Sequence, residues 1–79
     1  MLAFPAEPIP EPPDRHTCRA IREAAGLSRR ALAERLGCHE QTIVNWELGT
    51  VEVGGRRMVP YLRLLATLDR ETREREAAG

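Results

Sequence analysis

The sequence predicts an all-α protein, and two observations support this prediction. The chain has 79 residues with one Trp, one Tyr and one Phe, so its core must come mainly from Leu, Ile, Val and Ala. Apolar residues also recur every three or four positions in several segments, as on one face of a helix. A chain of this length allows one small domain, and we therefore expect a compact helical bundle.

The first two helices are predicted from their ends. Asp14 can cap a helix over residues 15–25, and Ser28 can cap one over residues 29–36, because a side-chain oxygen there accepts from free amides of the first turn. Gly37 follows where the chain must leave the second helix with positive φ. The apolar stripes are Cys18, Ile21 and Ala25 in the first helix and Leu32, Ala33 and Leu36 in the second.

The third helix is predicted over residues 40–48, directly after the glycine turn, and Gly49 ends it. Ile43 and Trp46 mark its buried side, which favours Trp46 as a core residue over Trp46 as a stacking platform for bases. Two short helices joined by a tight turn bury little against each other. Such a helix-turn-helix normally holds its second helix where it can enter the major groove of DNA.

The segment after the third helix has two interpretations. We expect a loop over residues 49–57 and a last helix from about Val59, because a proline such as Pro60 suits a first turn. Val51 and Val53 alternate before a Gly-Gly pair, which leaves a short β-wing as the alternative. The apolar stripe of the last helix is Met58, Tyr61, Leu62, Leu65 and Leu68.

These elements divide the chain into three parts. Residues 1–13 hold five of the six prolines and read as a disordered or polyproline-like arm, either inert or in contact with a partner or its own domain. Residues 14–68 are the helix-turn-helix domain. Residues 69–79 are a charged extension of the last helix or a tail, with opposite charges four residues apart.

The formal net charge is zero, but the charges are unevenly placed. Residues 1–14 hold three acids and no arginine, whereas residues 15–57 hold eight arginines and five glutamates. The basic excess therefore lies on the segment with the helix-turn-helix pattern. A local basic surface is what phosphate binding needs, because each neutralised phosphate releases a counterion.

The segment from Cys18 to Leu68 resembles the Cro and phage-repressor helix-turn-helix family, also called XRE-like. The stretches IREAAGLS, LAERLGC and QTIVNWELG carry the resemblance. It implies a lambda-repressor-like bundle of four or five helices that binds operator DNA, usually as a symmetric dimer on a palindromic site. The chain departs from the family in its longer loop, with Gly54-Gly55, and in the short sequence left for a fifth helix.

The resemblance also implies roles for individual residues. Those placed to face base edges are Glu40, Gln41 and Asn45, and those placed at phosphates are Arg29, Thr42, Arg56 and Arg57. Gln or Asn can hold adenine, and Glu can accept from cytosine, although Glu40 can equally be an anion at a helix N-terminus. Arg22 and Glu47 are expected to form a partly buried ion pair. Tyr61, Leu64 and Leu68 are candidate dimer contacts.

Other classes of function are disfavoured. No arrangement for nucleophilic, acid–base or phosphate-loop chemistry has support, so we expect no enzyme, cofactor or small-molecule ligand. His16, Cys18, Cys38 and His39 lack the spacing of a zinc site. No apolar run is long enough for a bilayer, no secretory signal is evident, and two cysteines suit the reducing cytoplasm.

The sequence therefore predicts a sequence-specific DNA-binding regulator, a small phage or mobile-element repressor or autoregulator that acts by occupying its operator. Two alternatives stay open. The first is an architectural, excisionase-like protein that bends DNA for a recombinase, which a real wing would favour. The second is a protein-interaction module that keeps the fold but has lost DNA binding.

Overall fold

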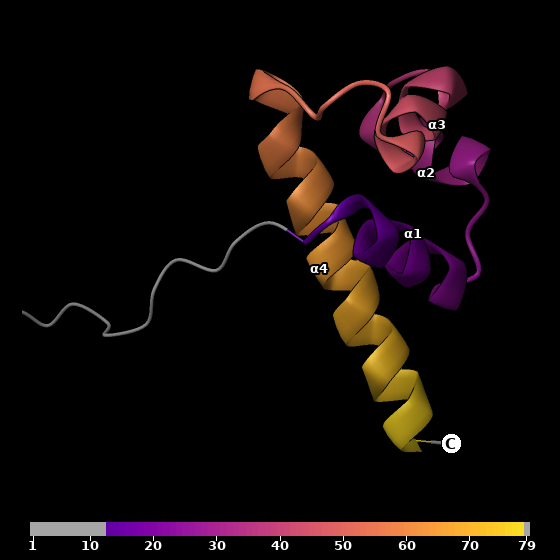
Figure 1. Ribbon diagram of the computed structural model, residues 1–79. Coiled ribbons are helices and arrows are strands. Elements are labelled where there is room, and N and C mark those ends of the chain that lie inside the picture. Colours follow the sequence, from indigo (N-terminus) through magenta and orange to yellow (C-terminus); the bar gives the residue numbers. More distant parts are fainter. Residues whose placement is uncertain (1–12, 79) are drawn as a thin grey trace, which may run out of the picture.

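The computed structural model describes residues 13–78, which form four α-helices and no strand (Figure 1). The helices are α1 (Arg15–Ala24), α2 (Arg29–Leu36), α3 (Glu40–Leu48) and α4 (Gly55–Ala78). The predicted all-α class is confirmed. Of the proline-rich arm, only Pro13 is among the described residues, so the expectation for residues 1–12 lies outside them.

The predicted ends of α1 and α2 are confirmed to within one residue. Asp14 accepts from the Thr17 amide at 2.8 Å, and Ser28 accepts from the Ala31 amide at 3.0 Å. Gly37 then ends α2 with φ of 71°, a conformation that glycine adopts without a steric penalty. The N-cap of α3 is His39, whose side chain makes no capping hydrogen bond.

The core is centred on α1, which packs against both α3 and α4, while α2 packs against α3. Its most completely buried large side chains are Leu32, Ile43, Tyr61 and Leu65. Trp46 is 6% exposed, and its ring centroid lies 4.7 Å from that of Tyr61. Trp46 is therefore a core residue, as predicted, and the Trp46–Tyr61 pair joins α3 to α4.

The predicted start of the last helix is wrong. The helix begins at Gly55, where the Gly54 carbonyl accepts from the Arg57 amide at 3.0 Å. Pro60 is consequently inside α4 and lacks the N–H that would bond to the Arg56 carbonyl. One missing bond is tolerated in a helix of 24 residues. Met58 lies in the first turns of this helix and is exposed, unlike the buried Tyr61, Leu65 and Leu68 of the predicted apolar stripe.

The β-wing alternative is also wrong. The backbone of residues 50–54 forms no strand, and α4 takes up residues 55–58. The amides of Thr50 and Val51 both bond to the Asn45 carbonyl, at 3.0 and 3.4 Å. The connection therefore folds back onto the end of α3 and is not available to pair with a second strand.

The second half of α4 continues through the charged residues to Ala78 and extends beyond the rest of the bundle (Figure 1). Asp69 and Arg73 form an ion pair of 3.2 Å along the helix. Thr72 is buried, and Arg75 donates to its hydroxyl at 3.3 Å. Within residues 13–78, no helix combines the length and apolar character needed to cross a bilayer.

Candidate nucleic-acid interface

A cluster of three charged side chains, two buried and one half-buried, fixes α3 to α1 and α2. Arg22 of α1 holds Glu47 of α3 with two bonds, Nε to Oε2 at 2.6 Å and Nη2 to Oε1 at 3.0 Å. Arg29, the first residue of α2, donates its Nε to the same Oε1 at 2.9 Å. The third arm of Arg22, Nη1, bonds to the Leu27 carbonyl at 2.8 Å. One carboxylate thus connects the first three helices.

The electrostatics of this cluster favour its charged form. Burial alone would raise the pKa of Glu47, but hydrogen bonds and charge from Arg22 and Arg29 outweigh it, so that pKa lies below its ordinary value. The pKa of Arg22 is raised, first by its hydrogen bond to Glu47. Among the described residues, no buried side-chain nitrogen or oxygen lacks a hydrogen-bond partner, as a buried ion pair requires.

Arg15 also holds the C-terminal end of α3. Its Nη1 donates to the Glu47 carbonyl at 3.3 Å, where a cation suits the negative end of the helix dipole. Its side chain also lies against Gly49, so closely that a Cβ on Gly49 would sit 2.8 Å from the Arg15 Nε. Sequence analysis missed Arg15, because a contact across 32 residues leaves no local pattern.

The predicted base-reading residues lie along α3. Glu40 and Gln41 are exposed in its first turn, and Asn45 is half-buried one turn later. Gln41 Nε2 donates to Asn45 Oδ1 at 3.1 Å, and Thr50 Oγ1 donates to the same oxygen at 3.3 Å. Thr50 was also missed. Its position directly after the glycine that ends α3 was the available signal.

The predicted phosphate-contacting residues are in three places. Arg29 is at the start of α2 and is already bonded to Glu47. Thr42 is half-buried on α3. Arg56 and Arg57 are exposed, but they belong to the first turn of α4 and not to a loop, which corrects their predicted setting. Arg57 lies beside Leu36 and Trp46, so it stays close to the helix-turn-helix.

The predicted dimer contacts need correction. Tyr61 and Leu68 are 2% and 4% exposed and belong to the core of their own chain, and Leu64 packs against that core. Because α4 turns this stripe toward α1, neither Tyr61 nor Leu68 is free to meet a second copy. In residues 13–78, no three His, Cys, Asp or Glu side chains cluster as metal ligands would.

The fold, with α3 fixed to α1 and α2 by the contacts of Glu47 and Arg15, is that of a helix-turn-helix DNA-binding protein. A family model described as Helix-turn-helix matches residues 19–69. The chain therefore belongs to the XRE-type, Cro/repressor-like helix-turn-helix family, and it is a DNA-binding transcription regulator of that type. Searches among curated proteins and among solved structures gave no significant match.

Proposed function

We propose that this regulator is a sequence-specific repressor or autoregulator, of the kind carried by phages and mobile elements, that acts by occupying its operator. The observation that supports this most strongly is the contrast along α3. Ile43, Trp46 and Glu47 are buried on one side of the helix, and Glu47 is bonded to two arginines, whereas Gln41 is exposed on the other side. The helix is held rigidly by one face while its opposite face is open, as a helix that reads the major groove requires.

In this proposal Gln41 and Asn45 contact base edges, with Glu40 beside them. Three arginines supply the phosphate contacts, namely Arg29, Arg56 and Arg57, and Thr42 adds a hydroxyl. Arg29 keeps both roles, because its Nε bonds to Glu47 while the side chain remains 30% exposed. The buried carboxylate thus orients an arginine that contacts the backbone of DNA.

We further propose that the chain binds a palindromic operator as a homodimer. Its contacts must come from side chains other than Tyr61 and Leu68. Leu64, half-buried on α4, remains a candidate, and Leu48 and Val59, exposed large apolar residues at the end of α3 and the start of α4, are further candidates. The architectural alternative loses the feature that favoured it, since residues 50–58 form no wing.

Selection from random DNA followed by a salt titration tests the proposal. The selected sites should be two-fold symmetric. Three arginines per chain predict a slope of log affinity against log salt of about −5 for a dimer and about half of that for a monomer. A flat titration without any selected sequence would contradict DNA binding and favour a protein-interaction module.

A further inference from the structure

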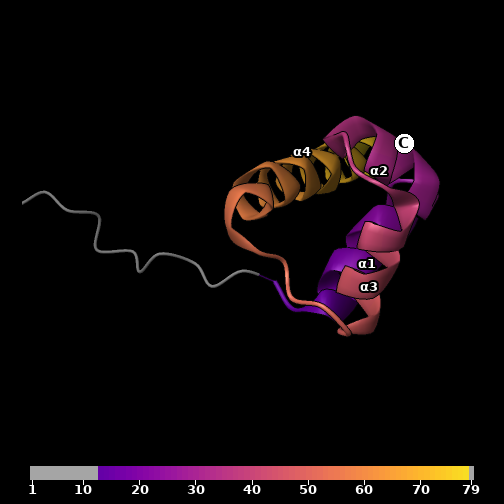
Figure 2. The same ribbon diagram turned by 90° about the horizontal axis from the view of Figure 1, so that it is seen from above.

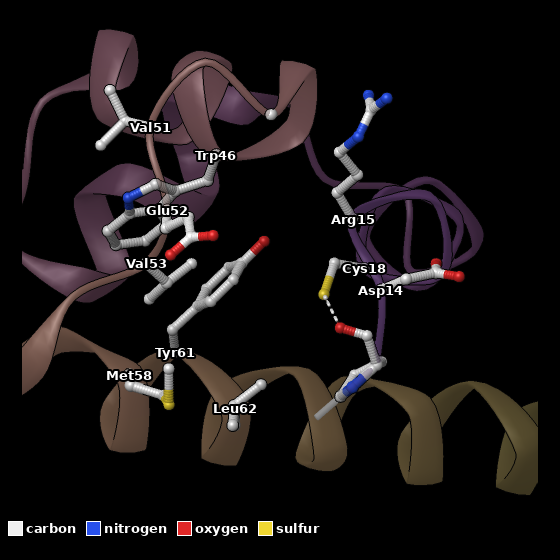
Figure 3. Close-up of a pocket in the computed structure, with 12 residues that line it drawn as sticks. Asp14, Arg15, Cys18, Trp46, Val51, Glu52, Val53, Met58, Tyr61 and Leu62 are labelled. Atoms are coloured by element: carbon white, nitrogen blue, oxygen red, sulfur yellow. Dashed lines mark hydrogen bonds between the residues drawn. The ribbon is translucent and has the colours of Figure 1, made fainter. Parts of the chain in front are cut away.

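A pocket of about 530 Å³ lies between the start of α1, the connection after α3 and the first turns of α4 (Figure 3). Most of its lining is apolar: Cys18, Trp46, Val51, Val53, Met58, Tyr61 and Leu62. Tyr61 rises from α4 between Trp46 and Cys18. None of the residues proposed to contact DNA lines this pocket, so its purpose is unassigned.

The pocket leaves apolar surface uncovered. Val51 is 50% exposed and Met58 is 36% exposed, and both line it together with the aromatic pair. Apolar surface gathered in one concave place in this way is typical of a binding site. The occupant should therefore be apolar and large enough to cover both side chains.

The chain itself enters at the edge of this pocket. Pro13 is one of the lining residues, and its carbonyl accepts from the Cys18 thiol at 3.6 Å. Asp14 is fixed as the N-cap of α1. The start of α1 and the connection after α3 lie on the same side of the molecule (Figure 2). Residues 1–12 are consequently attached beside the pocket, where a short tether keeps their local concentration high.

The chemistry of this segment suits the pocket. Residues 1–12 read MLAFPAEPIPEP, with Leu2, Phe4 and Ile9 as large apolar residues among four prolines. Proline-rich segments favour the polyproline II helix, which docks onto aromatic-lined grooves at a low cost in entropy. At about 3.1 Å per residue, a polyproline II segment that starts at Pro13 would span about 12 Å to residue 9 and about 28 Å to residue 4. That reach is enough for Ile9 and Phe4 to contact Trp46 and Tyr61, which line the same pocket as Pro13.

Electrostatic attraction does not account for binding of residues 1–12 to this pocket. The segment carries Glu7 and Glu11, and the charged residues in the pocket lining are Asp14, Arg15 and Glu52. Two acids and one arginine give the lining no net attraction for an acidic segment. Binding must then rest on apolar contact, and it should persist at high salt.

We propose that the chain's own N-terminal segment occupies this pocket, with Phe4 and Ile9 as its apolar anchors. The walls come from α1, the end of α3 and the start of α4, so the bound segment braces the DNA-reading helix against α4. This inference does not depend on which DNA sequence is read or on dimer formation. Its test therefore needs no DNA.

The test compares thermal unfolding of the full chain with two double variants. Phe4→Ser/Ile9→Ser removes the anchors, and Ala3→Ser/Ala6→Ser is the matched control in the same segment. We expect the anchor variant to lower Tm by about 5 °C, since about 1 kcal/mol shifts Tm by roughly 4–8 °C in a domain of this size. Acrylamide quenching of Trp46, the chain's one tryptophan, should increase as well. The control should leave both readouts unchanged, at 0.1 and at 0.5 M NaCl.

A second pair of substitutions locates the contact. Val51→Ser/Met58→Ser changes two exposed residues of the pocket, so this variant is expected to fold. If the segment lies on these side chains, adding Phe4→Ser/Ile9→Ser to this variant should lower Tm no further. Additive effects, an unchanged Tm in the anchor variant, or an equal loss in the alanine control would overturn the proposal. A Tm difference that depends on chain concentration would also overturn it, because the occupant would then be a second copy.

Discussion

Gln41 Nε2 donates a hydrogen bond to Asn45 Oδ1 at 3.1 Å, so two side chains proposed to read bases are linked to each other along α3. The same oxygen accepts from Thr50 Oγ1. These bonds hold the Asn45 amide in one orientation before DNA arrives. Preorganisation of this kind reduces the entropy lost on binding.

The first prediction concerns these two residues. Gln41→Ala and Asn45→Ala should each relax base preference at particular positions, by about 1–3 kcal/mol. Because the side chains are bonded, the double variant should lose less than the sum of the two single losses. Binding-site selection and a titration of each variant on the selected site measure both effects. Unchanged base preference in both single variants would refute the assigned reading face.

The second prediction distinguishes Arg29 from Arg57, both of which are proposed to contact phosphates. Arg57→Ala should weaken binding to all DNA sequences and reduce the salt slope by about one, with stability unchanged. Arg29→Ala should do the same and also lower the free energy of unfolding by about 1.5 kcal/mol, because Glu47 loses a charged hydrogen bond.

The matched control for these variants is Arg70→Ala, on the exposed second half of α4. It should leave DNA affinity, salt slope and stability unchanged. Urea unfolding measures the stability of the three variants, and salt titrations measure their DNA affinity and salt slope. A change at a single base position in Arg29→Ala or Arg57→Ala would show that the residue reads sequence and not phosphate.

The third prediction concerns Glu47 and acid pH. Glu47→Gln should lower the free energy of unfolding by about 3 kcal/mol at pH 7, because it leaves the buried Arg22 without a charged partner. The folded-state pKa of Glu47 is lowered, so its contribution is complete above its ordinary pKa of 4.5 and is lost as pH falls through the folded value. The difference between the two proteins should therefore shrink between pH 7 and pH 3.

Urea unfolding at several pH values measures this difference. The pKa of Asp14 is also lowered, by hydrogen bonds from Thr17, so Glu47→Gln should retain some loss of stability in acid. In Asp14→Asn, the part of the acid-induced loss of stability that is due to Asp14 should disappear, whereas the larger part due to Glu47 should remain. A constant difference between the parent and Glu47→Gln from pH 7 to pH 3 would contradict the assignment.

The fourth prediction compares two glycines with similar backbone angles. Gly37 and Gly49 have φ of 71° and 78°, so alanine at either position should cost about 1 kcal/mol for its left-handed conformation. A Cβ on Gly37 meets open space, whereas one on Gly49 would meet Arg15. Gly49→Ala should therefore cost more, by about a further 1 kcal/mol, since Arg15 must leave the end of α3.

Adding Arg15→Ala tests the cause of this difference. In that background, Gly37→Ala and Gly49→Ala should become equally destabilising, because the side chain that excluded the Cβ is gone. Urea unfolding of the five variants supplies the comparison. If the extra cost of Gly49→Ala persists without Arg15, the close contact is not its origin.

The candidate site divides into parts that local sequence predicts and parts that it does not. Arg22 and Glu47 could be paired in advance through the family pattern, and Gln41 and Asn45 could be placed on one helix face by their spacing. Arg29 was not predicted as the second partner of Glu47, because the family pattern assigned Arg29 to phosphate, and its bond to Glu47 depends on how α2 packs beside α3. The start of α4 was also mispredicted, since Pro60 is tolerated in its interior.

The sequence by itself determined the first three helices, their turns and the family. These features depend on caps, glycines and apolar spacing within about four residues, where backbone geometry leaves few options. Only the tertiary structure decided that Arg29 joins the buried pair, that Arg15 covers the end of α3, and that Tyr61 belongs to its own core. Each of these depends on how helices distant in the chain pack, and packing is set by the shape and charge of the whole domain rather than by neighbouring residues.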